Sequence, residues 1–189
     1  MDADMQIPLR NDTPNSLMAA ILYEDGSSFD IFIQDFANAL KNKGHNLAGV
    51  IQINQQRHNS RHCDMILQDL ATGRTVVISE PRGEEARGCR LNVAALLEAG
   101  MTIHTSLSDK TELLLINKFG KMESEGAGLR DVIIEAHMLG IPVLVGVPIR
   151  NKESWLAFSG GATELLTPDL SLVWTWLEQA LSLRYINQD

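Results

Sequence analysis

A chain of 189 residues suits one domain that can bury a sizeable hydrophobic core. Hydrophobic residues make up 44% and aromatic residues 5%, a balance typical of a globular protein with an aliphatic core. The net charge of −8 disfavours nonspecific binding to nucleic acid or to an anionic membrane, although it leaves room for a local basic site. With two cysteines, a polar N-terminus and no run of about 20 apolar residues, the sequence predicts a cytoplasmic protein without a membrane span.

The first half of the chain is predicted to form a strand–helix–strand unit followed by a β-hairpin. Residues 16–23 are a continuous apolar run, as in a strand buried on both faces. Apolar residues then recur at helical spacing over 29–40, and residues 47–53 read as a second strand. After a polar loop at 54–62, residues 64–80 have the pattern and the Thr-Gly turn of a hairpin. Strand–helix–strand units of this kind build parallel sheets.

Helices and strands alternate through the second half as well. The predicted elements are a loop at 81–92, a helix at 93–100 that can continue toward His104, a strand at 112–117, a loop at 118–128, a helix at 129–139, a strand at 141–148, a short helix at 152–158, an edge strand at 163–166 and a closing helix at 168–185. The closing helix carries an apolar stripe formed by Leu172, Trp176, Leu177 and Leu181. This alternation predicts an α/β fold: a doubly wound, mostly parallel sheet flanked by helices, with an inserted β-hairpin. Residues 16–189 would form this single domain, and residues 1–15 a flexible N-terminus.

Four fragments occur in an order that points to a known P-loop family. They are MILQDLATGRTVVIS (65–79), RGCRLNVAALLEAG (87–100), LLLINKFGKMESEGAGL (113–129) and IPVLVGV (141–147). Their order resembles the nucleoside-triphosphatase family first described from thermophiles, which includes the human cancer-related nucleoside triphosphatase. Within them, Gly120-Lys121-Met122-Glu123 matches that family's motif letter for letter. The resemblance implies a P-loop NTPase-like fold.

A bacterial family of unknown function is similar at further positions. It shares RGCRL (87–91), an NKFGK-type segment (117–121) and a WLAF-GG segment (155–161). Members of that family are often associated with molybdenum genes. The resemblance therefore implies a role in molybdenum metabolism.

The residues that would hydrolyse a nucleotide are missing from both phosphate-site motifs. A working P-loop reads GxxxxGK[ST]; its amides and lysine hold phosphates and its hydroxyl binds Mg²⁺. Residues 23–30 (YEDGSSFD) have one glycine and no lysine, and Glu24 and Asp25 would repel a polyphosphate. Where the resembled family has an Asp that holds Mg²⁺ and a Glu that orients water, this chain has Asn117 and Lys118. We therefore predict no appreciable hydrolysis of ATP or GTP and no catalytic residue.

The same departures favour an anion site beyond the carboxyl ends of the strands, where ligands of doubly wound sheets bind. Loops 24–28, 81–92 and 117–128 are predicted to lie there, and they bring together cations and the start of a helix. The candidate ligand-binding residues are Gly26, Ser27, Ser28, Arg87, Cys89, Arg90, Asn117, Lys118 and Lys121. Their ligand would be a small oxyanion such as molybdate, phosphate or sulfate, or a nucleotide. In the alternative interpretation the serines only cap a turn, Cys89 is a structural thiol and the cations pair with glutamates such as Glu123.

A metal site stays open at one place. His58, His62 and Cys63 have a spacing that can bind Zn²⁺, but in a loop this pattern is weak. No metal or cofactor is therefore predicted, and residues 155–161 are interpreted as a packing and turn element.

The sequence thus favours a non-hydrolysing, P-loop-derived protein that binds a small oxyanion or a nucleotide. We expect a homodimer and no nucleic-acid partner, since no nucleic-acid-binding motif emerges. Two alternatives stay open. One is an interaction or scaffold protein without a small ligand, and the other is an NTPase that a second subunit completes.

Overall fold

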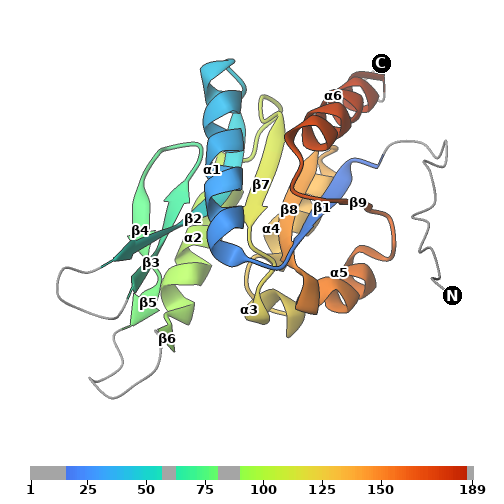
Figure 1. Ribbon diagram of the computed structural model, residues 1–189. Helices are drawn as coiled ribbons and strands as arrows, with labels where there is room; N and C mark the ends of the chain where they lie inside the picture. The colour runs from blue at the N-terminus through green and yellow to red at the C-terminus, as the bar shows by residue number, and fades with distance from the viewer. Residues whose placement is uncertain (1–15, 57–62, 81–89, 187–189) are drawn as a thin grey trace, which may run out of the picture.

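The computed structural model describes residues 16–56, 63–80 and 90–186 (Figure 1). Within them, the main sheet has seven strands in the order β4-β3-β2-β7-β8-β1-β9. These strands are β1 (Met18–Tyr23), β2 (Leu47–Gln56), β3 (Cys63–Asp69), β4 (Thr75–Val77), β7 (Leu113–Asn117), β8 (Val143–Pro148) and β9 (Glu164–Leu166). The five strands from β2 to β9 in that order run parallel, and β3 and β4 add an antiparallel hairpin at one edge.

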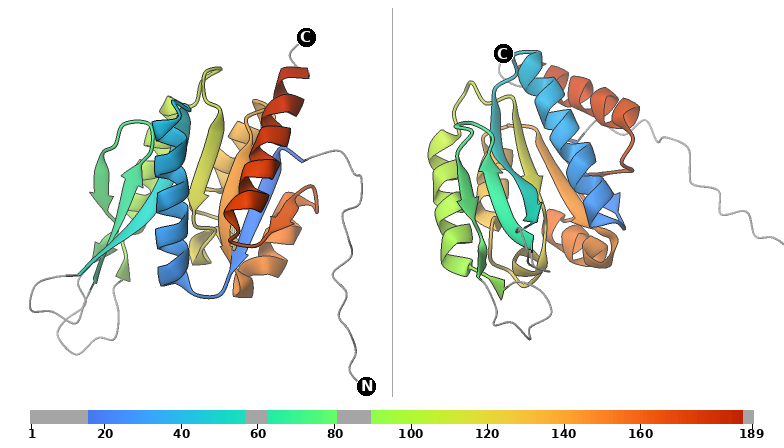
Figure 2. Two further views of the ribbon diagram at one scale, coloured as in Figure 1. Left: turned by 45° about the horizontal axis from the view of Figure 1, so that its top comes forward. Right: turned by 60° about the vertical axis from the view of Figure 1, so that its left-hand side comes forward.

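Helices cover both faces of this sheet. They are α1 (Gly26–Asn42), α2 (Val93–Ser106), α3 (Lys121–Ser124), α4 (Arg130–Met138), the 3₁₀ turn η1 (Ile149–Asn151), α5 (Lys152–Ser159) and α6 (Leu170–Ile186). Helices α1 and α6 lie on one face, and α2 and α4 lie on the other (Figures 1 and 2). The predicted doubly wound α/β architecture is therefore confirmed.

The central strands are apolar throughout because both of their faces are covered. Every residue of β7 is buried, and successive side chains alternate between the two cores. Leu113 and Leu115 pack with α1 and α6, whereas Leu114 and Ile116 pack with α2 and α4. The α1 face and the α2 face, named for these two helices, are therefore separate environments.

Three predicted boundaries are wrong, each because a tertiary partner changes the local structure. Residues 54–56, expected in a loop, extend β2 because they pair with 63–65 of β3. Residues 79–80 leave the predicted hairpin as β5 (Ser79–Glu80) and pair with β6 (Arg90–Leu91). The predicted loop 118–128 contains the short helix α3.

The closing helix is confirmed, but its buried stripe is shifted by one position at each end. Trp176 and Leu177 are buried as predicted, whereas Leu172 is 42% exposed. Val173 and Ala180 complete the buried stripe instead. Spacings of three and four fit both choices, so only the packing of α6 on the sheet distinguishes them.

Candidate functional site

Three turns lie at the carboxyl ends of the parallel strands. The β1–α1 turn is Glu24–Asp25, the β7–α3 turn spans 118–120, and β8 ends directly at η1. In Figure 1 they gather at the lower edge of the sheet, where α1 begins and where α3 and α5 lie. This edge is where ligands of open α/β sheets bind.

The β1–α1 turn is short, and the chain's own carboxylate caps the helix that follows. Asp25 is the N-cap of α1, and its carboxylate accepts the N–H groups of Ser27 and Ser28 at 3.2 Å each. The Ser28 hydroxyl donates to the same carboxylate, and this bond, with the two amides, lowers the pKa of Asp25 below its ordinary range. A two-residue turn cannot form the longer ring of amides that a P-loop wraps around phosphate.

This cap changes the role expected of the predicted cradle Gly26-Ser27-Ser28. The two serine amides are already hydrogen-bonded, so an external anion would have to displace Asp25 from them. Their part in ligand binding stays a prediction. The capping interpretation, which the sequence also allowed, explains the observed bonds without a ligand.

Removing this carboxylate should weaken the protein in a pH-dependent way. We expect Asp25→Ala to lower the melting temperature by roughly 2–4 °C at pH 7, the usual effect of losing a cap in a chain of this size. Because the folded-state pKa is lowered, the contribution is present above about pH 4 and disappears as the pH falls through the folded value. Thermal unfolding at pH 7 and pH 2.5 tests this. An equal difference between variant and wild type at both pH values would contradict the assigned role.

Asn117 stands at the end of β7, where P-loop enzymes carry an acid. It is 1% exposed, and its Nδ2 donates to Asp30 Oδ1 on α1 at 2.8 Å. Its Oδ1 is buried, with no hydrogen-bond partner among the described residues. The Asn117 amide therefore hydrogen-bonds to a side chain of α1, and Asn117 itself lacks the negative charge that would hold a cation.

Asp30 and Arg150, which the sequence analysis did not select, lie in the same cluster. Burial raises the pKa of the Tyr23 phenol, the Asp30 carboxylate raises it further, and the Arg150 guanidinium opposes both. Arg150 follows the end of β8 as Lys118 follows the end of β7, so the strand-end rule could have found it. Asp30 carries no such signal, because its partner is 87 residues away in sequence.

An aromatic pair fills the space beside this cluster. The rings of Tyr23 and Phe29 stack with their centroids 4.0 Å apart. Phe29 also lies against Gly146 of β8, where an added Cβ would come within 2.3 Å of the ring. The α1 face of the site is thus packed with aromatic side chains around one amide–carboxylate bond.

Lys118 and Lys121 line a small cavity that belongs to the α2 face. The cavity measures about 140 Å³ and is bordered mainly by apolar side chains of β3, α2 and the 120–129 segment. None of residues 23–30 lines it. Lys118 is half-buried, whereas Lys121 is exposed and lies 3.7 Å from Glu125. The sheet therefore separates Gly26, Ser27 and Ser28 from Lys118 and Lys121, while Asn117 borders the cavity and also bonds to α1.

The RGCRL segment reaches this cavity at its end. Leu91 of β6 is one of the lining residues. Arg90 precedes it in β6, while Arg87 and Cys89 lie outside the described residues. Their roles as ligand contacts stay predictions.

Glu123 is the residue that holds the lysine-bearing loop in place. It is 3% exposed, and its two carboxylate oxygens accept the N–H groups of Gly120 at 2.8 Å and Leu129 at 3.0 Å. Gly128 has a positive φ of 68°, and an added Cβ there would come within 2.1 Å of the carboxylate. The Gly120–Glu123 motif is thus a structural loop closure, and Glu123 contacts backbone amides where the alternative interpretation had it pairing with a lysine.

The WLAF-GG segment packs behind this loop, as predicted. Trp155 is fully buried, and its ring meets that of Phe119 edge-on with centroids 5.3 Å apart. Gly160 ends α5 in the left-handed conformation that favours glycine. The segment therefore packs against the 118–129 loop through Phe119 and does not line the cavity.

Within residues 16–56, 63–80 and 90–186, no group of three or more His, Cys, Asp or Glu side chains could hold a metal ion. His58 and His62 lie outside these ranges, so the proposed zinc spacing is untested. No helix in the described part of the chain is long and apolar enough to cross a bilayer.

Comparison with known proteins places the chain among P-loop relatives. The model of a family described as "Protein of unknown function (DUF2478)" matches residues 18–176. The protein named Molybdenum import ATP-binding protein ModC 2 from Bradyrhizobium diazoefficiens is 35% identical over 172 residues, which make up 91% of this chain. The chain spans only 19% of that relative's length.

Two solved structures share the fold. The crystal structure of THEP1 from Aquifex aeolicus has a TM-score of 0.58 at 19% identity and covers 88% of this chain and 98% of that one. The solution structure of a human cancer-related nucleoside triphosphatase has a TM-score of 0.58 at 12% identity and covers 90% and 97%. At these identities the likeness concerns the fold alone, and it confirms the predicted P-loop NTPase-like class.

Proposed function

The chain belongs to the DUF2478 family, and from that starting point we propose that it binds a small oxyanion without hydrolysing a nucleotide. The observation that carries the proposal is the contrast between the two faces of the site. On the α1 face, Asp25 already uses the amides of Ser27 and Ser28. On the α2 face, Lys118 and Lys121 line a cavity.

The size of that cavity favours an oxyanion over a nucleotide. Its volume of about 140 Å³ is well below the roughly 300–1,000 Å³ of pockets that hold larger small molecules. Two lysines attract an anion and repel Mg²⁺, and Asn117 offers no charge to hold the metal of a metal–nucleotide complex. The Glu123 carboxylate also lines the cavity, but its two oxygens are bonded to the backbone amides of Gly120 and Leu129. Arg87, Cys89 and Arg90 are proposed as further contacts from the neighbouring segment.

Molybdate is the oxyanion we propose to test first, because a relative carries the name of a molybdenum import ATP-binding protein. Thermal shift and equilibrium dialysis should compare molybdate, tungstate, phosphate, sulfate, ADP and ATP, with and without Mg²⁺. At about 100 times its Kd, a ligand of the native state adds roughly 2.7 kcal/mol, or about 5–10 °C in a chain of this length.

The lysines supply the matched variants. We expect Lys118→Ala with Lys121→Ala to weaken oxyanion binding at least tenfold, since each lost charge-assisted contact is worth about 1.5–3 kcal/mol. Lys43→Ala is the control for the loss of a lysine charge outside the site, because Lys43 lies over the Trp174 ring at 4.1 Å and does not line the cavity. A lack of response to every anion would favour the scaffold alternative, and Mg²⁺-dependent phosphate release that Lys118→Ala abolishes would favour the NTPase alternative.

A further inference from the structure

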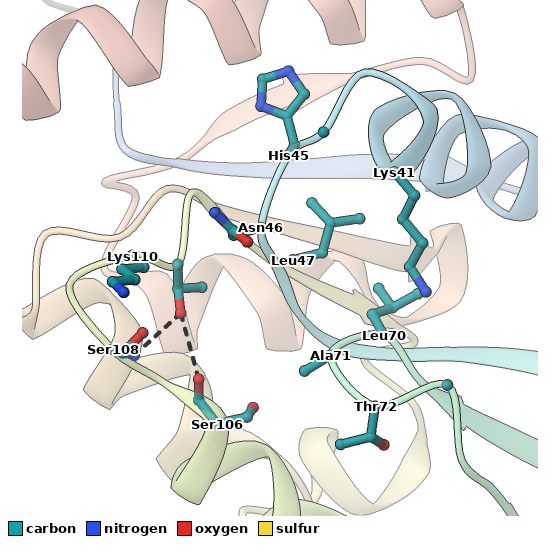
Figure 3. A pocket seen from close by; sticks show the side chains of 13 residues that line it. Lys41, His45, Asn46, Leu47, Leu70, Ala71, Thr72, Ser106, Ser108 and Lys110 are labelled. Atoms are coloured by element: carbon teal, nitrogen blue, oxygen red, sulfur yellow. Dashed lines mark hydrogen bonds between the residues drawn. The ribbon is translucent and has the colours of Figure 1, made fainter.

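A second cleft lies at the opposite end of the sheet, where the parallel strands begin (Figure 3). It measures about 660 Å³ and is walled by the end of α1, the β3–β4 turn and the loop between α2 and β7. This volume falls within the roughly 300–1,000 Å³ of small-molecule pockets. It shares no lining residue with the cavity of Lys118 and Lys121.

The charged side chains that line this cleft are basic. Lys41 extends from the end of α1 toward the turn at Leu70, and Lys110 lies in the loop on the other wall (Figure 3). His45 stands at the rim with its ring turned away, where Nδ1 lies 3.1 Å from Glu112 Oε1. No Asp or Glu is among the described residues of the lining, although the chain has 24 acidic and 16 basic residues. The two lysines favour a local positive potential, and the carboxylates next to the cleft are engaged: Asp69 bonds to Thr72, and Glu112 bonds to His45 and Asn46.

The end of α1 carries the partial negative charge of a helix C-terminus, which the two lysines have to offset. Near this end, the carbonyl oxygens of residues 39–41 accept the N–H groups of Lys43, Gly44 and His45. The hydroxyl of Ser108 also lines the cleft and can donate to an anion. Ser108 therefore adds a donor to those of Lys41 and Lys110.

The β3–β4 turn and the loop between α2 and β7 are each held in position by hydrogen bonds. In the β3–β4 turn, Asp69 Oδ1 accepts the N–H and the hydroxyl of Thr72 at 2.6 and 2.7 Å. In the opposite loop, Thr111 Oγ1 accepts the Ser108 N–H at 3.1 Å, and the buried Arg184 donates to the carbonyl oxygens of Thr111 and Asp109. A cleft that is formed in advance loses less entropy when a ligand binds.

We propose that this cleft binds a small molecule carrying phosphate groups, with Lys41 and Lys110 as the charged contacts. The site is independent of the proposed oxyanion cavity, because the two lie at opposite ends of β7. Inorganic pyrophosphate is the simplest probe, since it offers two anionic groups without an organic part.

Isothermal titration of the full chain with pyrophosphate tests the proposal. We expect Lys41→Ala with Lys110→Ala to weaken binding at least tenfold, because two charge-assisted contacts are lost. Lys43→Ala, at the same end of the sheet but outside the cleft, and the pair Lys118→Ala with Lys121→Ala should each change the affinity less than twofold. The exposed positions of Lys41 and Lys110 should leave the melting temperature within a few degrees of wild type.

Three outcomes would overturn the proposal. They are no pyrophosphate binding by the wild-type chain, an equal loss in Lys43→Ala, and a loss that follows Lys118 and Lys121. The last of these would assign pyrophosphate to the other cavity, so the failure of one proposal can be told from the failure of the other.

Discussion

Replacing Asn117 by aspartate is expected to destabilise the protein by about 2–4 kcal/mol at pH 7, although it restores the acid of a hydrolysing P-loop protein. The buried Asn117 amide donates to Asp30 at 2.8 Å. The substitution removes that donor and sets two carboxylates against each other where water screens them poorly. Urea unfolding measures the loss, and a phosphate-release assay with Mg²⁺ and ATP should stay at background.

Two further measurements distinguish electrostatic repulsion from poor packing as the cause of this loss of stability. Two carboxyl groups this close do not both ionise, so the destabilisation should shrink as the pH falls from 7 toward 4. Combining Asn117→Asp with Asp30→Asn exchanges the amide and the carboxylate and should recover most of the stability. Without either the pH dependence or the recovery, electrostatic repulsion between residues 30 and 117 could not be the cause.

The fold was largely predictable because its central strands are apolar on both faces. The runs that become β1, β7 and β8 are short, apolar and bounded by turns, and they alternate with amphipathic helices, so they predict buried strands. Polar edge segments were harder to predict. Residues 54–56 join β2 through backbone pairing with β3, and backbone bonds leave no pattern in the side chains.

The site was only half predictable, because a strand-end rule selects an edge of the sheet and says nothing about its two faces. Asn117 and Lys118 are neighbours in sequence and both border the cavity of the α2 face, yet the Asn117 amide bonds to a side chain of α1. Gly26, Ser27 and Ser28 at the start of α1 suggested an anion cradle, but the preceding Asp25 already accepts the N–H groups of both serines. Whether such a carboxylate repels a ligand or replaces it depends on its rotamer, which only a structure shows.

Removing the Glu123 carboxylate is expected to have the second large effect. Glu123→Ala leaves the N–H groups of Gly120 and Leu129 without their acceptor inside a buried loop. Unsatisfied buried donors cost about 1–3 kcal/mol each, so we expect a total loss of roughly 2–4 kcal/mol in urea unfolding. Glu123→Gln keeps one good acceptor, so its stability should fall between those of the wild type and Glu123→Ala. Gly128→Ala should disturb the same contact from its other side, because its Cβ would meet the carboxylate at 2.1 Å.

Glu123→Ala also shows whether loop geometry or charge governs oxyanion binding in the cavity of Lys118 and Lys121. Charge alone predicts tighter oxyanion binding in Glu123→Ala, since a negative group beside Lys121 is removed. We expect weaker binding, because Glu123 fixes the turn from which Lys118 and Lys121 project. Glu125→Ala is the matched control: this exposed carboxylate lies 3.7 Å from Lys121, and its loss should change stability by less than about 0.5 kcal/mol and leave binding equal or tighter. Tighter binding in both variants would mean that charge governs the cavity and that Glu123 only stabilises the fold.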